Sequence, residues 1–205
     1  DWSSDVCSSD LFDTVNIEEE NMDVNFVTQI VQESEECKSF ANEISETMRS
    51  CLHNLQKPSI TNSVFASISH NDLWVNNIMI KLKSNSSAIK IVDFQLMDYG
   101  SCANDLLFFL FTSVQWPVIK LHFNYLVRLY YKHLIHTLTI TKCDTTHFNF
   151  SSFQDEIDFC VRHRQFYHIM VMLRYVFAIK ENVKDLSEIT VEDISSEKVS
   201  KECRE

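Results

Sequence analysis

The chain has 205 residues, a formal net charge of −11 and a single glycine, Gly100. This length allows one domain with a substantial core, and 45% hydrophobic with 12% aromatic residues excludes an intrinsically disordered chain. The acidic balance argues against a nucleic-acid or anionic-membrane partner, since both need clustered Lys and Arg. One glycine rules out a glycine-rich phosphate loop and leaves little access to positive φ, which favours a mainly helical α+β fold.

The first 55 residues divide into a leader and a helical stretch. The opening "DWSSDVCSSDLF" lacks an initiator Met and repeats Ser-Ser-Asp, so we interpret residues 1–12 as a non-native-looking leader outside the fold. Between residues 17 and 55, apolar residues such as Phe26, Ile30 and Phe40 recur at three- and four-residue steps. This spacing predicts an amphipathic helix in two pieces, broken near Ser34 and ended by Pro58.

The middle of the chain predicts three short strands. They are "SVFASIS" (63–69), "NIMIKLK" (77–83) and "AIKIVDF" (88–94), the last two joined by the polar turn "SNSS". If residues 84–87 form the loop, residues 83 and 88 pair, so that Ile78 lies opposite Asp93 and Asn77 opposite Phe94. Opposite residues of an antiparallel pair lie about 5 Å apart. The predicted register therefore brings Asn77 and Asp93 side by side.

Helices are predicted again after the hairpin. One runs from Asn104 to about Val114, another from about Pro117 to Ile140, and two pieces span about 152–179; Pro117 suits a first helical turn. Residues 181–205 are charged and weakly periodic, which indicates a flexible tail. Most aromatic residues here are expected in the core, although some could line a substrate pocket: Phe108, Phe109, Phe111, Trp116, Phe123, Tyr125, Tyr130 and Tyr131.

Cysteine and histidine usage indicates the cellular compartment more than it indicates chemistry. The seven cysteines are odd in number and contain no C-x-x-C, which favours reduced thiols in a cytoplasmic protein over a disulfide framework. No apolar run is long enough to span a bilayer. His133 and His136, with Cys143 and His147 nearby, could suggest a metal site. Packing within an aromatic-rich helix is the preferred interpretation, because no second ligand pair has zinc-finger spacing.

The polar residues at the base of the predicted hairpin suggest phosphoryl transfer. The side chains of Asn77 and Asp93 could hold Mg²⁺, which takes one or two protein oxygens and completes its shell with phosphate and water. Asp72, on the preceding loop, could accept the proton of a substrate hydroxyl. An isolated loop Asp is usually a turn or capping residue, but the spacing His70-x-Asp72-x-x-x-x-Asn77 followed by Asp93-Phe94 is that of a kinase catalytic loop and metal-binding segment.

These motifs resemble one family. "SHNDLWVNNIM" followed by "IVDFQLMDYGSCANDLLFFL" is similar to the ecdysteroid-kinase-like (CHK kinase-like) family, within the choline kinase and aminoglycoside phosphotransferase group of protein-kinase-like folds. The resemblance implies that Asp72 is the catalytic base and that His70 supports the loop from beneath. It implies Asn77 and Asp93 as metal ligands, and Asp105 as a helix-start residue that hydrogen-bonds back to the loop. Trp74 is either a loop anchor or a substrate contact.

The resemblance also implies an activity and a lobe organisation. The activity is ATP- and Mg²⁺-dependent phosphorylation of an alcohol group on a small molecule, an ecdysteroid or a similar apolar acceptor. Residues 13–180 would be the carboxy-terminal lobe of a kinase-like fold without its amino-terminal lobe, because no strand lysine or glycine-containing loop precedes residue 70. A catalytically inactive remnant or binding module is the alternative. Acceptor identity and oligomeric state are left open.

Overall fold

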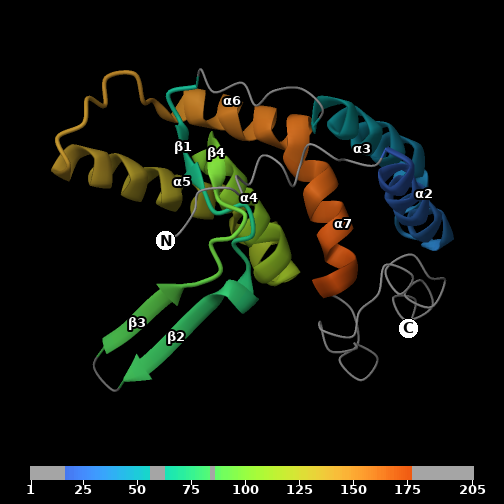
Figure 1. Ribbon diagram of the computed structural model, residues 1–205, viewed down its shortest axis with the longest axis horizontal. Coiled ribbons are helices and arrows are strands. Elements are labelled where there is room, and N and C mark those ends of the chain that lie inside the picture. The colour runs from blue at the N-terminus through green and yellow to red at the C-terminus, as the bar shows by residue number, and fades with distance from the viewer. Residues whose placement is uncertain (1–16, 56–62, 84–85, 177–205) are drawn as a thin grey trace, which may run out of the picture.

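The structure, a computed structural model, describes residues 17–55, 63–83 and 86–176 (Figure 1). The predicted leader at residues 1–12 and tail at residues 181–205 lie outside the described residues. Helices make up most of the described chain, and the strands form two small antiparallel sheets, β1 with β4 and β2 with β3. The expectation of a mainly helical α+β fold is therefore confirmed.

The chain begins with two helices separated by a short break. They are α2 (Ile17–Glu33) and α3 (Ala41–Leu55), with the 3₁₀ turn η1 (Lys38–Phe40) between them. The backbone N–H groups of Cys37 and Lys38 both donate to the carbonyl of Ser34, so the break falls where the sequence predicted it. Apolar residues of the two helices pack with one residue from a later helix: Val24, Val27, Val31, Ala41, Met48, Cys51, Leu52 and Tyr167.

The first sheet joins strands that are far apart in the sequence. Strand β1 (Ala66–Ser69) pairs antiparallel with β4 (Asp98–Ser101), a strand that the sequence analysis did not predict. Strand β1 is also shorter than the predicted 63–69, because residues 63–65 form a bend and turn. Gly100 lies in β4, where an added Cβ would stand 3.2 Å from Asn104 Nδ2 and 3.4 Å from Ser69 Oγ. The glycine thus allows a close approach between the sheet and the following helix.

The second sheet is a hairpin whose register corrects the prediction. Strand β2 (Ile78–Lys83) pairs with β3 (Ser86–Ile91), so Lys83 faces Ser86 and Ile78 faces Ile91. The expected pairs of residues 83 with 88 and Ile78 with Asp93 are wrong by two residues. Two-residue connections are the commonest in hairpins because they match the twist of the strands, and the shorter connection lets two serines join the ladder. The shift is even, so every side chain keeps its predicted face.

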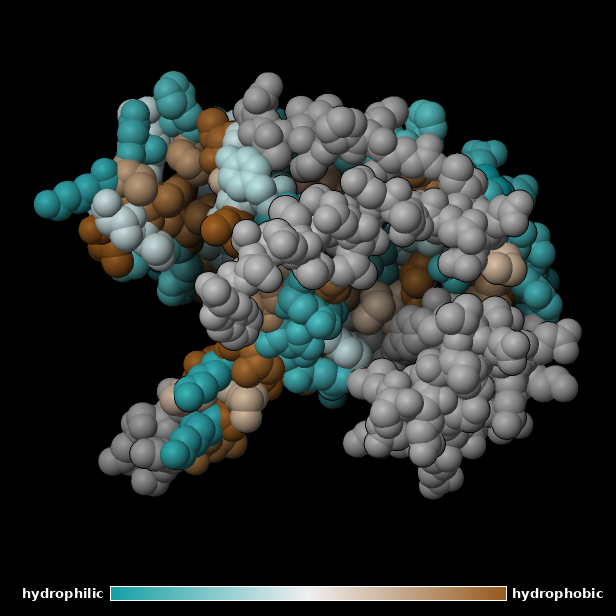
Figure 2. Space-filling model, viewed as in Figure 1, coloured by the Kyte–Doolittle hydropathy of each residue, from teal (hydrophilic) through white to brown (hydrophobic). Residues whose placement is uncertain are grey.

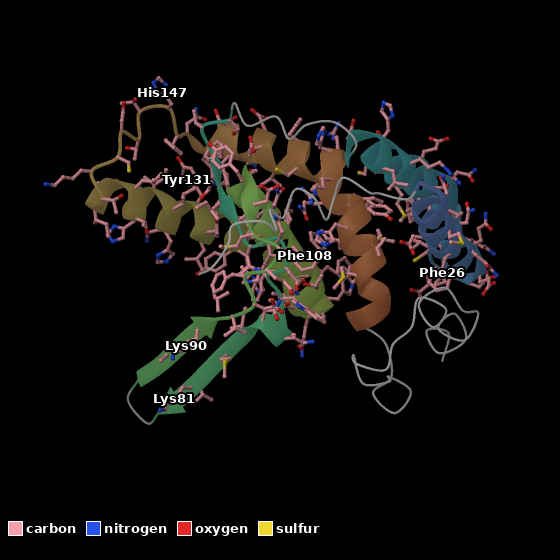
Figure 3. All side chains as sticks on the ribbon, viewed as in Figure 1. Phe26, Lys81, Lys90, Phe108, Tyr131 and His147 are labelled. Carbon is pink, nitrogen blue, oxygen red and sulfur yellow. The ribbon has the colours of Figure 1, made fainter. Side chains whose placement is uncertain are left out.

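The hairpin projects from the helical body and is amphipathic (Figures 1 and 2). Its apolar face carries Ile80, Leu82 and Ile89, which are all exposed. Lys81 and Lys90 belong to the opposite face (Figure 3). A two-stranded hairpin is only marginally stable in water by itself. Its attachment to the helical body at the base of the strands therefore stabilises it and positions the residues at that base.

The main core surrounds helix α4 (Cys102–Ser113). The side chain of Ser101 caps this helix by accepting from the Ala103 backbone N–H at 3.2 Å. Figure 3 shows Phe108 at the centre of the molecule, and this residue is fully buried. The cluster around it contains Phe65, Ala103, Leu106, Leu107, Leu110, Val127, Phe153, Ile157, Cys160 and Ile169. Helix α4 therefore connects the core to the sheet β1–β4 at its amino-terminal end.

Three further helices complete the described chain. They are α5 (Trp116–Ile140), α6 (Phe150–Cys160) and α7 (Phe166–Val176), with the π-helical turn η3 (Val161–Gln165) between the last two. Pro117 lies in the first turn of α5, as predicted. Most of the predicted core aromatics are at least partly buried, whereas Trp116 and Tyr125 are exposed.

The histidine and cysteine interpretations have a mixed outcome. His133, His136, Cys143 and His147 are all exposed, so the prediction that they pack within the helix is wrong. Among the described residues there is no group of three or more His, Cys, Asp or Glu side chains that could hold a metal. The five described cysteines are free thiols, while Cys7 and Cys203 lie outside the described residues. Within the described part, no helix is both long and apolar enough to cross a membrane.

His168 on α7 should make the fold sensitive to mild acid. Its ring stacks on Phe108 at 4.4 Å, and burial, with a smaller effect of Arg164, lowers its pKa from 6.5 to about 4. As the pH falls from 6.5 towards 4, His168 binds a proton in the unfolded chain but not in the folded chain. The free energy of unfolding therefore falls across this window. We expect His168→Gln to lose less stability than the wild type between pH 7 and pH 5.

Urea unfolding at the two pH values measures this difference. His133→Gln is the matched control, because His133 is exposed on α5. An equal loss of stability in the wild type and His168→Gln would contradict the assignment of His168 as a buried neutral residue.

Candidate active site

The loop after β1 is held by a carboxylate from the core helix. The Asp105 carboxylate in the first turn of α4 accepts from the backbone N–H groups of His70 at 2.7 Å and Asn71 at 2.8 Å. His70 and Asn71 are both buried, so these two N–H groups have no access to bulk water. Hydrogen bonds to a charged acceptor are stronger than neutral ones, and Asp105 therefore fixes the loop to the core.

Two residues of the site have a left-handed backbone. Asn71 has φ 64° and Asp93 has φ 63°, whereas the scarcity of glycine led us to expect few positive-φ positions. Asn and Asp tolerate this region better than other non-glycine residues. The Asn71 side chain also donates to the Leu96 carbonyl at 3.0 Å, which joins the loop to the segment that follows Asp93. Residues held in such conformations are often found at functional sites.

The His70 ring connects the loop to the end of the hairpin. The Asp72 backbone N–H donates to His70 Nδ1 at 3.3 Å, so this nitrogen is the acceptor. The other nitrogen, Nε2, then carries the proton and donates to the Val92 carbonyl at 2.9 Å. An imidazole with its proton on Nε2 alone can make both of these hydrogen bonds. His70 thus connects the Asp72 backbone to Val92, and its supporting role stays a prediction.

Asn77 holds Asp72. Its side-chain Nδ2 donates to the Asp72 backbone carbonyl and to Asp72 Oδ2, both at 2.8 Å. Its backbone N–H donates to the Trp74 carbonyl at 3.0 Å, which closes the 3₁₀ turn η2 (Val75–Asn77). Because the amide nitrogen is committed to Asp72, the amide oxygen of Asn77 points to the other side and accepts no hydrogen bond from any described residue.

Asp93 follows directly after the point where the hairpin joins the loop. The Val92 backbone N–H donates to the Asn77 carbonyl at 3.0 Å, so Val92 rather than Phe94 continues the ladder beside Asn77. Asp93 is the next residue, and its carboxylate is exposed. Its negative charge reaches Asp72, where it raises the pKa. Figure 3 shows nitrogen and oxygen atoms gathered at the base of the hairpin.

The environment of Asp72 makes it a stronger base than an ordinary carboxylate. Burial raises the pKa of the Asp72 carboxyl above its usual 3.8, and this effect outweighs the hydrogen bond from Asn77 and the influence of His70, which lower it. Asp93 raises it further. A carboxylate with a raised pKa holds a transferred proton better, which suits general-base chemistry.

The donor set at this site fits a hard cation. An amide oxygen from Asn77 and an exposed carboxylate from Asp93 are oxygen ligands of the type that Mg²⁺ prefers. They would provide two protein ligands and leave the remaining positions for phosphate oxygens and water. The residues present are therefore compatible with the magnesium–nucleotide complex that the resemblance implies.

Comparison with known families identifies the chain. Residues 6–143 match the sequence model of the ecdysteroid kinase-like family. The chain belongs to the ecdysteroid kinase-like family. The searches of curated proteins and of solved structures gave no match. The matched range includes the loop, the hairpin and helices α4 and α5, so the family resemblance based on residues 60–115 is confirmed.

The fold of this ecdysteroid kinase-like chain brings together five residues that the sequence selected. His70, Asp72, Asn77, Asp93 and Asp105 meet at the junction of the hairpin and α4. Their catalytic and metal-binding roles stay predictions, as does the division of the chain into a leader, a lobe and a tail.

Sequence reasoning did not select two residues that shape the site. Asn71 supplies the positive φ and the bond to Leu96, and Ser113 accepts from the Val75 backbone N–H at 2.8 Å. An Asn directly before Asp72 could have suggested a left-handed turn. Nothing in the sequence indicated that the end of α4 would contact η2.

Proposed function

We propose that this protein is an ATP-dependent small-molecule kinase that transfers a phosphoryl group to an alcohol hydroxyl. One observation carries the proposal: the Asp72 carboxylate is fixed by Asn77 within electrostatic reach of Asp93, on a loop that Asp105 ties to the core. Family membership supports the same reaction class. The proposal assigns the role of base to Asp72 and that of cation ligand to the exposed Asp93.

The proposed reaction assigns one step to Asp72. The acceptor hydroxyl gives its proton to the carboxylate as its oxygen bonds to the γ-phosphorus of ATP, and the bond from that phosphorus to the β,γ-bridging oxygen breaks to release ADP. Asn77 keeps the carboxylate oriented through Oδ2, so that Oδ1 faces the acceptor. Such positioning, with electrostatic stabilisation, supplies most of the rate in phosphoryl transfer.

Asn77 and Asp93 are proposed to hold the cation. Magnesium, when bound, would neutralise charge on the phosphate oxygens. The amide oxygen of Asn77 is left available because its nitrogen is engaged by Asp72. The carboxylate of Asp93 makes no hydrogen bond with a described residue, and its backbone turn directs the chain away from β3.

The surroundings of Asp72 favour an apolar acceptor. Val75, in η2, is 57% exposed, and Phe94, whose ring lies 5.0 Å from that of His70, is 50% exposed. Exposed apolar side chains close in sequence or space to a polar loop suit a ligand with a hydrophobic body and a hydroxyl. An ecdysteroid or another hydroxylated apolar compound has this chemistry.

Loss of the Asp93 charge should weaken the binding of magnesium. Changing groups that merely orient a metal ligand costs about 10- to 100-fold in affinity, so replacing a direct ligand should cost at least as much. We expect Asp93→Asn to raise the Mg²⁺ concentration for half-maximal ADP release by roughly tenfold or more. Magnesium titration of the full-length protein measures it, with Asp98→Asn as a control. An unchanged midpoint would remove Asp93 from the metal site.

The function itself is tested by ADP release and product formation in a panel of hydroxylated acceptors. Steroid alcohols should be phosphorylated in preference to polycationic aminoglycosides. If the full-length protein releases no ADP with any acceptor, the alternative of a catalytically inactive binding module replaces the kinase proposal.

A further inference from the structure

Trp74 carries a buried hydrogen-bond donor that the mechanism above does not use. Its indole Nε1 is fully buried and makes no hydrogen bond of standard geometry. Among the described residues only one other buried side-chain atom, Oε1 of Gln165, is in this state. Burying an unpaired polar group of this kind is unfavourable. A tryptophan placed for packing alone could be phenylalanine, so the N–H group needs an explanation.

The position of the Trp74 ring is fixed from two sides. The ring packs against the main core cluster around α4. Its backbone is part of the catalytic loop, where its N–H donates to the Asp72 carbonyl at 3.1 Å and its carbonyl accepts from Asn77 at 3.0 Å. The next residue, Val75, is bound to Ser113 at the end of α4. The indole therefore has little freedom to rotate towards solvent.

The group within reach of the indole is the Asp72 carboxylate. The backbone bond between the two residues keeps the Trp74 side chain near the Asp72 carboxylate. Burial, Asn77, His70 and Asp93 have larger effects on the pKa of Asp72, and the Trp74 side chain also lowers it. Asn77 occupies Oδ2 of that carboxylate. The second oxygen, Oδ1, accepts no hydrogen bond of standard geometry from a described residue.

We propose that Trp74 is a positioning residue: its indole N–H donates to the Asp72 carboxylate and, with Asn77, holds that carboxylate in one plane. The effect of this contact on catalysis rests on the proposed function. A carboxylate held by one donor can rotate about its terminal torsion, whereas a carboxylate held by two donors cannot. A fixed plane keeps one lone pair of Oδ1 aimed at the acceptor hydroxyl. Asn77 then holds the carboxylate from the hairpin side, and Trp74 holds it from the core side.

The contact can be tested without any substrate. In a protein labelled with ¹⁵N at the tryptophan indoles, Asp72→Ala should move the Trp74 indole resonance and increase its exchange with solvent by about tenfold, the effect of losing one hydrogen bond. Trp116, which is 64% exposed on α5, provides the control resonance and should not move. A Trp74 resonance that is identical in the wild type and Asp72→Ala overturns the proposal.

The consequence for catalysis is tested by Trp74→Phe in the full-length protein, with Trp116→Phe as the matched control. Phenylalanine keeps an aromatic ring against the core but removes the N–H. We expect kcat to fall by about tenfold with the acceptor KM unchanged, because the lost interaction orients the base and does not bind substrate.

The two kinetic parameters separate the possibilities. An unchanged kcat, or a change confined to KM, overturns the positioning role. If the wild type has no phosphotransfer activity, the proposed function fails, while the indole resonance still decides whether Trp74 binds Asp72.

Discussion

Replacing Asp72 with asparagine is expected to lower kcat by about 10²- to 10⁴-fold, the usual contribution of a general base. Asparagine has nearly the same shape, and its side-chain oxygen can still accept from Asn77 Nδ2 in place of Asp72 Oδ2. It cannot accept the proton of an acceptor hydroxyl. The measurement is product formation under saturating ATP, Mg²⁺ and acceptor, so that a change in binding does not enter the comparison.

The same variant should fold at least as well as the wild type. Burial raises the pKa of Asp72 in the folded state, so at about pH 7 the folded chain holds a charge that the unfolded chain accommodates better. Below the ordinary carboxyl pKa of 3.8 the wild-type residue is protonated in both states and this difference vanishes. A thermal melt of Asp72→Asn checks this, with Asp155→Asn, an exposed position on α6, as control. Full activity in a folded Asp72→Asn protein would exclude Asp72 as the base.

Removal of the Asp105 carboxylate should destabilise the site and the fold together. The residue accepts two backbone N–H groups from the buried loop residues His70 and Asn71. Hydrogen bonds to a charged group contribute about 1.5–3 kcal/mol each, and an unpaired buried donor adds to the loss. We therefore expect Asp105→Ala to lower the free energy of unfolding by about 3–5 kcal/mol. Urea unfolding measures it directly.

Two further variants test whether the loss of stability comes from the hydrogen bonds of Asp105. Asp105→Asn retains one side-chain acceptor and should lose less stability than Asp105→Ala. Asp158→Ala removes an exposed carboxylate whose contact with Arg162 is 3.9 Å long, and such surface pairs contribute about 0–1 kcal/mol. If Asp105→Ala and Asp158→Ala were equally stable, the loop would be held by something other than Asp105.

Local patterns predicted the helices well. The break near Ser34, the first-turn position of Pro117 and the extent of α5 followed from apolar spacing and proline chemistry, which act over a few residues. The pairing of the strands was harder to predict from the sequence. Strand β4 is four residues long and pairs with β1 across about thirty residues of sequence, so neither strand shows a strong pattern by itself.

For the hairpin, the sequence predicted which strands pair but not the exact residues that lie opposite each other. The predicted pairs differ from the observed ones by two residues, an even number, so Met79 and Ile80 lie on the faces that the predicted pairing implied. The number of connecting residues was wrong, because a run of four polar residues fits a long loop as well as a short one with two extra pairs. The predicted neighbour of Asn77 therefore changed from Phe94 to Val92.

The family of this protein could be read from its sequence alone. The spacing of His70, Asp72, Asn77 and Asp93, and of Asp105 after them, indicated the family, because it matches a kinase catalytic loop followed by a metal-binding segment. Spacing is informative for His70, Asp72, Asn77 and Asp93 because they lie on one loop and at the base of one hairpin, whose geometry is local.

How the rest of the fold supports this loop could be seen only in the folded chain. The structure shows that Asp105 accepts from two loop N–H groups, that the backbone turns at Asn71 and Asp93 without glycine, and that the indole nitrogen of Trp74 is buried. The first of these depends on helix α4 packing against the loop. A contact between segments thirty residues apart leaves no period in the sequence, and burial is a property of the folded chain as a whole.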